Sequence, residues 1–219
     1  PLVAATLLSG SAQFIDGFIV TAHFDERTFA VFRYGARELP LATLLANALN
    51  NAMLPEFGMK EKLKENLEKL KASVARLMHF LFPLTAVLLL ASKPLFPVVF
   101  NPEFAESATV FNVYLLLVIS RLLMPQTILN GLRQTRQIMV ASFFELTINV
   151  SLSLLFVRFW GIAGIAAATF IAYLFEKLYL AFVVRRNLNI RLSEYHPLKY
   201  YAWYSFGIVA IFIFAEVVF

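Results

Sequence analysis

The chain has 219 residues, of which 60% are hydrophobic and only 15% charged, with a mean hydropathy of +0.72 and a net charge of +5. A soluble domain carries roughly 25% charged residues, so this composition excludes a soluble enzyme, a disordered tail and a fibrous protein. Cysteine is absent, which excludes disulfides and thiolate metal sites. The composition therefore predicts an integral membrane protein whose positive charge lies in cytoplasmic loops rather than on a nucleic-acid-binding surface.

Seven apolar segments are candidate membrane spans, since a helix needs about 20 apolar residues to cross the hydrocarbon core. The segments are too long, and alternate too little, to be barrel strands. The predicted spans are 2–22, 28–53, 75–91, 109–129, 138–157, 162–184 and 201–219. The expected fold is an all-α polytopic helical bundle. Because the chain starts without a Met and stops inside an apolar run, we expect it to be a fragment of a longer protein.

The link between the second and third spans predicts an amphipathic helix at about 59–73. Leu63, Leu67 and Leu70 follow the spacing of one helical face, with lysine and glutamate on the other faces. Such a helix can lie on anionic cytoplasmic headgroups, or it can be a charged linker between two spans. Four acidic residues between 56 and 68 offset its lysines, which favours the linker.

Lysine and arginine alternate between the links, as the positive-inside rule requires. The first, third and fifth links hold three such residues, and the second, fourth and sixth hold eleven. This predicts a multi-pass protein of the cytoplasmic (inner) cell membrane, with Pro1 on the cytoplasmic side and Phe219 on the outer side.

Ionisable residues within the predicted spans are costly to bury, so each should face a partner or a wet cavity. If adjacent spans form hairpins, Asp16 lies level with Arg33, and Arg121 lies level with Glu145, for which Lys177 competes. These matches suggest ion pairs that set helix register. The alternative is a polar cavity for an anionic head group, and Arg37 is the best candidate to line it, since no charged residue lies level with it.

Two polar stripes sharpen the cavity hypothesis. At helical spacing the second span carries Arg33, Arg37, Pro40, Leu44, Asn47 and Asn51, and the fifth carries Ser142, Glu145, Asn149 and Ser153. A water-filled path explains such stripes, and hydrogen bonding between helices is the alternative. The predicted cavity-lining set is Arg33, Arg37, Asn47, Asn51, Arg121, Glu145 and Asn149, and Asp16 and Lys177 are candidates for an ion pair or for ion coupling. No phosphate loop, metal-ligand spacing or nucleophile motif occurs, so we expect neither an enzyme nor a cofactor.

Several runs resemble the second half of polysaccharide flippases, the exporters of O-antigen and lipid-linked oligosaccharide. These belong to the multidrug/oligosaccharidyl-lipid/polysaccharide (MOP) exporter superfamily. The runs are AQFIDGFIV (13–21), FAVFRYGARELPL (29–41), NNAMLPEF (50–57), LFPVVFNPEFAESATVFNVYLLL (95–117), NGLRQTRQ (130–137) and INVSLSLLFVRFWGIAGIAAATFIAYL (148–174). They form a loose pattern of turns and small residues, and the glycine usual in the outer loop is replaced by Asn101-Pro102.

The resemblance implies a C-terminal lobe of a two-lobed transporter that works by alternating access. Its substrate would be an undecaprenyl-pyrophosphate-linked oligosaccharide for surface polysaccharide, and Arg33 and Arg37 would suit the pyrophosphate. Expected partners are this lipid-linked substrate, membrane lipids, the N-terminal lobe and polysaccharide polymerase machinery, but no nucleic acid. The alternatives are a cation-coupled multidrug exporter of the same superfamily, using Asp16 or Glu145, and a membrane glycosyltransferase or ligase.

Overall fold

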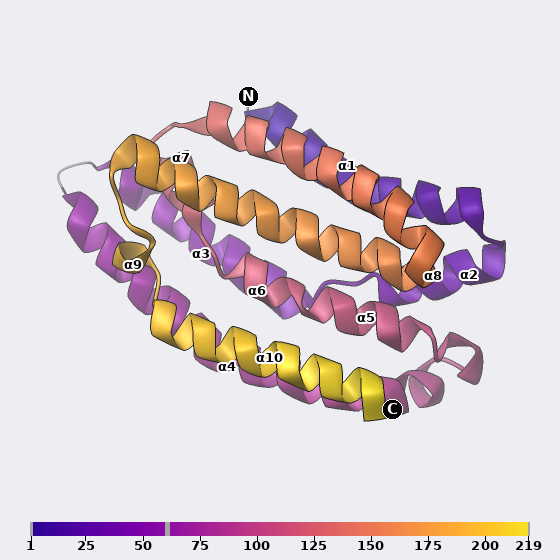
Figure 1. Ribbon diagram of the computed structural model, residues 1–219. Helices are drawn as coiled ribbons and strands as arrows, with labels where there is room; N and C mark the ends of the chain where they lie inside the picture. Colours follow the sequence, from indigo (N-terminus) through magenta and orange to yellow (C-terminus); the bar gives the residue numbers. More distant parts are fainter. Residues whose placement is uncertain (1, 60–61, 219) are drawn as a thin grey trace.

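The computed structural model describes residues 2–59 and 62–218, and all regular structure in these ranges is helical (Figure 1). Pro1 and Phe219, to which the sequence assigned opposite sides of the membrane, lie outside the described residues. Within them, three helices are each long and apolar enough to cross a membrane: α4 (Leu63–Val99), α8 (Thr135–Leu188) and α10 (Leu198–Val218). The segments Ser107–Arg121 and Pro125–Gly131 together form a bent fourth candidate. An all-α membrane bundle is therefore confirmed.

The first two predicted spans differ in continuity. Helix α1 (Leu2–His23) is unbroken, whereas the segment predicted as 28–53 forms two helices, α2 (Glu26–Gly35) and α3 (Pro40–Gly58). Pro40 lacks a backbone N–H, and Leu39 before it has an extended conformation, so α3 begins at Pro40 as a separate helix. The prediction of one straight polar stripe along this span is wrong.

Helix α4 joins two segments that the sequence had separated. Residues 63–73 of the predicted amphipathic helix are its first turns, and it continues beyond the predicted span at 75–91. Leu67 and Leu70 are buried by protein, and the amide of Asn66 donates a 2.6 Å hydrogen bond to the carbonyl of Glu56 in α3. The apolar stripe therefore packs against the bundle rather than on lipid headgroups. Residues 60–61 lie outside the described residues.

The predicted fourth span is broken as well. After the short 3₁₀ helix η2 (Pro102–Phe104), α5 (Ser107–Leu115), α6 (Leu117–Arg121) and α7 (Pro125–Gly131) follow one another, with a 49° bend before α7. Pro125 again begins the helix after the break. The second and fourth spans thus share an interruption that ends in proline.

Helix α8 contains the fifth and sixth predicted spans as two arms that run back along each other (Figure 1). They meet at Gly161, whose φ of 55° and ψ of −138° belong to a region that glycine alone adopts readily. The short helix α9 (Leu192–Tyr195) then leads into α10. The turn at Gly161 therefore allows two spans to follow each other without a loop.

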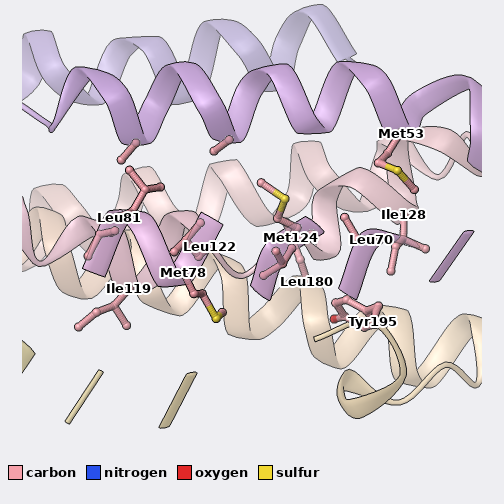
Figure 2. Packing of buried hydrophobic residues seen from close by; sticks show 14 of the residues in the cluster. Met53, Leu70, Met78, Leu81, Ile119, Leu122, Met124, Ile128, Leu180 and Tyr195 are labelled. Atoms are coloured by element: carbon pink, nitrogen blue, oxygen red, sulfur yellow. The ribbon is translucent and has the colours of Figure 1, made fainter. Parts of the chain in front are cut away.

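The apolar core lies between α3, α4, the end of α5, α6, α7, both arms of α8, α9 and α10. Figure 2 labels its members Met53, Leu70, Met78, Leu81, Ile119, Leu122, Met124, Ile128, Leu180 and Tyr195. A second cluster joins α1, α2, α5 and α8 and includes Ile19, Phe32, Val113 and Tyr173. The polar residues of the candidate site lie beside this second cluster.

Candidate functional site

The break between α2 and α3 is the centre of the candidate site. Gly35 ends α2 against the start of α5, where a Cβ on Gly35 would clash with the Ser107 carbonyl and with Val110. Pro40 begins α3, which leaves residues 36–39 outside any helix. Non-helical backbone at membrane depth is tolerated where it is buried in protein or lines a polar cavity, so this segment is where a ligand site is expected.

Two arginines lie at this break. Arg33 lies in the last turn of α2 and Arg37 in the non-helical segment, and both side chains are exposed. They line a pocket of about 150 Å³ among α1, α2 and α5. The remaining lining residues are Gly17, Phe29, Phe32, Ala36 and Tyr114. Neither arginine makes an ion pair with a described carboxylate, so both guanidinium groups are available to an anion.

Glu38 and Arg121 form a bidentate ion pair one residue from Arg37. Arg121 Nε donates to Glu38 Oε2 at 2.7 Å, and its terminal nitrogen donates to Oε1 at 2.6 Å. The guanidinium also lies over the Tyr173 ring, 5.1 Å from the ring centroid. Since Arg121 ends α6, this pair joins the interruption of the second span to that of the fourth.

A chain of buried hydrogen bonds lies behind the arginine pocket. Asn149 Nδ2 donates to Thr169 Oγ1 at 3.0 Å, and Thr169 Oγ1 donates to Asp16 Oδ2 at 2.7 Å. The Tyr114 hydroxyl donates to the same Asp16 oxygen at 3.3 Å. Asp16 Oδ1 and Asn149 Oδ1 have no hydrogen-bond partner among the described residues. Tyr114 therefore contacts both the pocket and a buried carboxylate with a free acceptor oxygen.

Two further buried carboxylates, Glu145 and Glu176, lie on the two arms of α8. Lys177 Nζ bonds Glu176 at 2.7 Å and Gln126 at 2.9 Å, and all of these groups are buried or partly buried. Glu145 is fully buried, and neither of its carboxylate oxygens finds a hydrogen-bond partner in the described part of the chain. Across that part, no group of three or more His, Cys, Asp or Glu side chains could hold a metal ion.

Both predicted ion pairs are wrong. Asp16 bonds Tyr114 and Thr169 instead of Arg33, and Arg121 bonds Glu38 instead of Glu145. Lys177 bonds its neighbour Glu176 and does not pair with Glu145. The hairpin argument assumed continuous helices and compared only adjacent spans. The broken second span instead allows Glu38 to turn toward the fourth span.

The structure places Arg121, partly buried, in the ion pair with Glu38, and separates the other six predicted cavity residues into two groups. Arg33, Arg37, Asn47 and Asn51 are exposed on α2, the break and α3, whereas Glu145 and Asn149 are buried in the bundle. Tyr114 and Thr169 are site residues that the sequence analysis missed, because a tyrosine or threonine in a span gives no charge signal. Glu38 is one of the ionisable residues within the predicted spans that need a partner, but the hairpin model assigns it none.

Comparison with known proteins identifies the family. The sequence profile described as lipid II flippase MurJ matches residues 2–219. The chain belongs to this family. A probable lipid II flippase MurJ of Bdellovibrio bacteriovorus is 27% identical over an alignment of 173 residues, which covers 71% of this chain and 32% of that protein. The chain thus spans about a third of the length of this curated relative.

Two solved structures share the fold. A lipid II flippase MurJ in an inward closed conformation superposes with a TM-score of 0.75 at 17% identity, covering 98% of this chain and 46% of that one. An outward-facing multidrug resistance MATE-family transporter of the MOP superfamily superposes with a TM-score of 0.60 at 16% identity, covering 95% of this chain and 51% of that one. The predicted MOP-type transporter fold is therefore confirmed.

The assignment to the polysaccharide exporters is corrected, because the matching family is that of lipid II flippases. The superfamily was identified correctly from turns and small residues that the shared fold requires. Such residues specify helix ends and close packing and carry no information about the glycan. The family is named for a flippase, which agrees with the expectation of a transporter rather than an enzyme.

Proposed function

We propose that this chain is one lobe of a transporter that moves lipid II across the cytoplasmic membrane by alternating access, and that Arg37, with Arg33, binds the pyrophosphate of the substrate. The observation that carries the proposal is the position of Arg37. It is an exposed arginine in the non-helical break between α2 and α3, beside a pocket and without an ion-pair partner among the described residues, in a chain of the lipid II flippase family. Guanidinium groups bind phosphate oxygens through paired, charge-assisted hydrogen bonds.

In this proposal the exposed face of α2 and α3 lines the cavity between this lobe and the rest of the transporter. Asn47 and Asn51 continue the polar surface beyond the break. The links that contain eleven lysines and arginines lie toward the cytoplasm, and those with three lie on the outer side. The substrate head would pass along the polar face while its lipid tail stays in the bilayer.

We further propose that the buried Asp16 cluster couples transport to an ion. Asp16 Oδ1 and Asn149 Oδ1 accept no hydrogen bond from any described residue, and a buried carboxylate inside a membrane protein is a natural carrier of a proton or a cation. Tyr114 bonds Asp16 and also lines the arginine pocket. Ion binding at Asp16 would therefore change the position of a residue of the substrate site.

The test is depletion of the full-length protein, followed by mass spectrometry of the undecaprenyl-pyrophosphate lipids. Accumulation of lipid II, and rescue by the wild-type gene but not by Arg37→Ala, is the expected result. Accumulation of a complete surface-polysaccharide repeat unit instead would assign the polysaccharide substrate. If no lipid-linked precursor accumulates and drug susceptibility rises, the multidrug exporter alternative is correct.

A further inference from the structure

The ion pair between Glu38 and Arg121 is bidentate and largely buried. Its side chains are only 10% and 23% exposed, and both carboxylate oxygens of Glu38 are bonded to Arg121. The two residues lie at the interruptions of two different spans, since Glu38 precedes α3 by two residues and Arg121 ends α6. The pair therefore connects the interruption of the second span to that of the fourth.

The two broken spans pack against each other on both sides of the ion pair. Helix α2 contacts α5 on one side of the interruptions, and α3 contacts α7 on the other. The non-helical segment between α2 and α3 contains Arg37, whose amide bonds the Gly35 carbonyl at 2.6 Å. Without a side-chain anchor, this short segment has several backbone conformations available and would present Arg37 in more than one direction.

The ion pair also neutralises the negative charge of Glu38. Glu38 is adjacent in sequence to Arg37, and a free carboxylate there would attract the Arg37 guanidinium and repel a phosphate. Arg121 occupies both oxygens of that carboxylate and neutralises it, while Tyr173 supports the guanidinium from behind. As a result, Arg37 has no ion-pair partner in the described part of the chain, although an acidic residue follows it directly.

We infer that Glu38 and Arg121 are positioning residues for substrate binding: their ion pair fixes the break and leaves Arg37 free to bind the pyrophosphate. This inference rests on the proposed function, because it assigns Arg37 the role of phosphate ligand. Glu38 and Arg121 act through Arg37 and do not themselves touch the substrate.

A double-mutant cycle on the full-length protein tests the inference, with undecaprenyl pyrophosphate as the binding probe. Glu38→Gln should weaken binding about tenfold, the scale of one charge-assisted hydrogen bond. In an Arg37→Ala background the same Glu38→Gln change should have no further effect, because its action passes through Arg37. The exchanged pair, Glu38→Arg with Arg121→Glu, should restore most of the binding that Glu38→Gln loses.

The control is Glu56→Gln, which removes an ion pair with Lys69 at 3.5 Å on an exposed surface and should leave binding unchanged. Thermal unfolding of every variant separates positioning from loss of fold. The inference is overturned if Glu38→Gln binds like wild type, or if its effect persists in the Arg37→Ala background. If Arg37→Ala itself binds like wild type, the proposed phosphate site fails and the inference fails with it.

Discussion

The polar residues of α2 and α3 and those of the first arm of α8 repeat at similar helical spacings, yet they occupy opposite environments. Arg33, Arg37, Asn47 and Asn51 are exposed, whereas Ser142, Glu145, Asn149 and Ser153 are buried. No described helix covers the exposed set, whereas the buried set lies on the arm of α8 that packs against α1 and the second arm of α8. A helical stripe of polar residues thus shows that one face differs from the others, but not what that face contacts.

The sharpest test of the exposed side is Arg37→Ala. Because the side chain is exposed and unpaired, the free energy of unfolding should change by less than about 0.5 kcal/mol. Transport of lipid II in reconstituted vesicles should nevertheless fall about a hundredfold or more, since a phosphate ligand is lost. Arg158→Ala, at an exposed arginine near the turn between the arms of α8, is the matched control and should transport normally. Equal transport by both variants would remove Arg37 from the site.

On the buried side, Asp16→Ala should lower the free energy of unfolding by about 2–3 kcal/mol. The change removes the acceptor of the buried Tyr114 hydroxyl, and it leaves the Thr169 hydroxyl only the longer bond to the Ile165 carbonyl. Thermal unfolding in detergent measures the loss. Asp25→Ala, which removes an exposed helix cap of α2, should cost less. A larger loss for Asp25 than for Asp16 would contradict the assignment of the buried cluster.

His196 is another buried polar residue, and it lies in the link between α9 and α10. Neither ring nitrogen has a described partner, and burial, assisted by the charge of Lys71, lowers the pKa of His196 from 6.5 to about 4. Since the unfolded chain binds the proton more tightly, stability is full above pH 6.5 and is lost as the pH falls toward 4. Between pH 7 and pH 5 the loss should be about 2 kcal/mol.

The variant His196→Phe should remove this part of the pH dependence while it keeps an aromatic ring against Tyr201. Unfolding midpoints at the two pH values give the comparison. An unchanged pH dependence in the variant would show that another group is responsible.

The smallest expected changes in the free energy of unfolding come from replacing one asparagine by alanine in the buried stripe of α8 and one in the exposed stripe of α3. Asn149→Ala should cost about 1–2 kcal/mol of unfolding free energy, because its buried amide bonds Thr169. Asn47→Ala should change it by less than about 0.5 kcal/mol, because the side chain is exposed. Equal costs at the two positions would mean that the exposed stripe is covered in the assembled protein.

Much of the fold could be predicted because it follows from local chemistry. Apolar length indicates the helices, and Pro40 and Pro125 begin helices because proline cannot donate the backbone hydrogen bond that a continuous helix requires. The sequence analysis predicts continuous spans at 28–53 and 109–129, without breaks at these prolines. Helix α4 shows the opposite case, since it passes through Pro83 without interruption. Whether a proline breaks a helix depends on the packing of its neighbours, which sequence alone does not show.

The candidate site was predictable in part for the same reason. Arg37 was identified because no charged residue lies level with it, and it is exposed and unpaired in the structure. The ion-pair partners could not be predicted, because Glu38 and Arg121 are 83 residues apart and meet only through two helix breaks. Depth along ideal helices is a poor guide when the helices are not continuous.

The sequence by itself determined that this protein is a helical membrane bundle of a transporter superfamily, with intramembrane charges that require partners. Hydrophobic length and the cost of burying charge act locally, so they can be read one segment at a time. Only the tertiary structure decided which stripe is buried, which carboxylate bonds which arginine, and that Arg37 remains free. Those outcomes depend on which helices pack together and where they break, and that is settled by contacts between residues far apart in the chain.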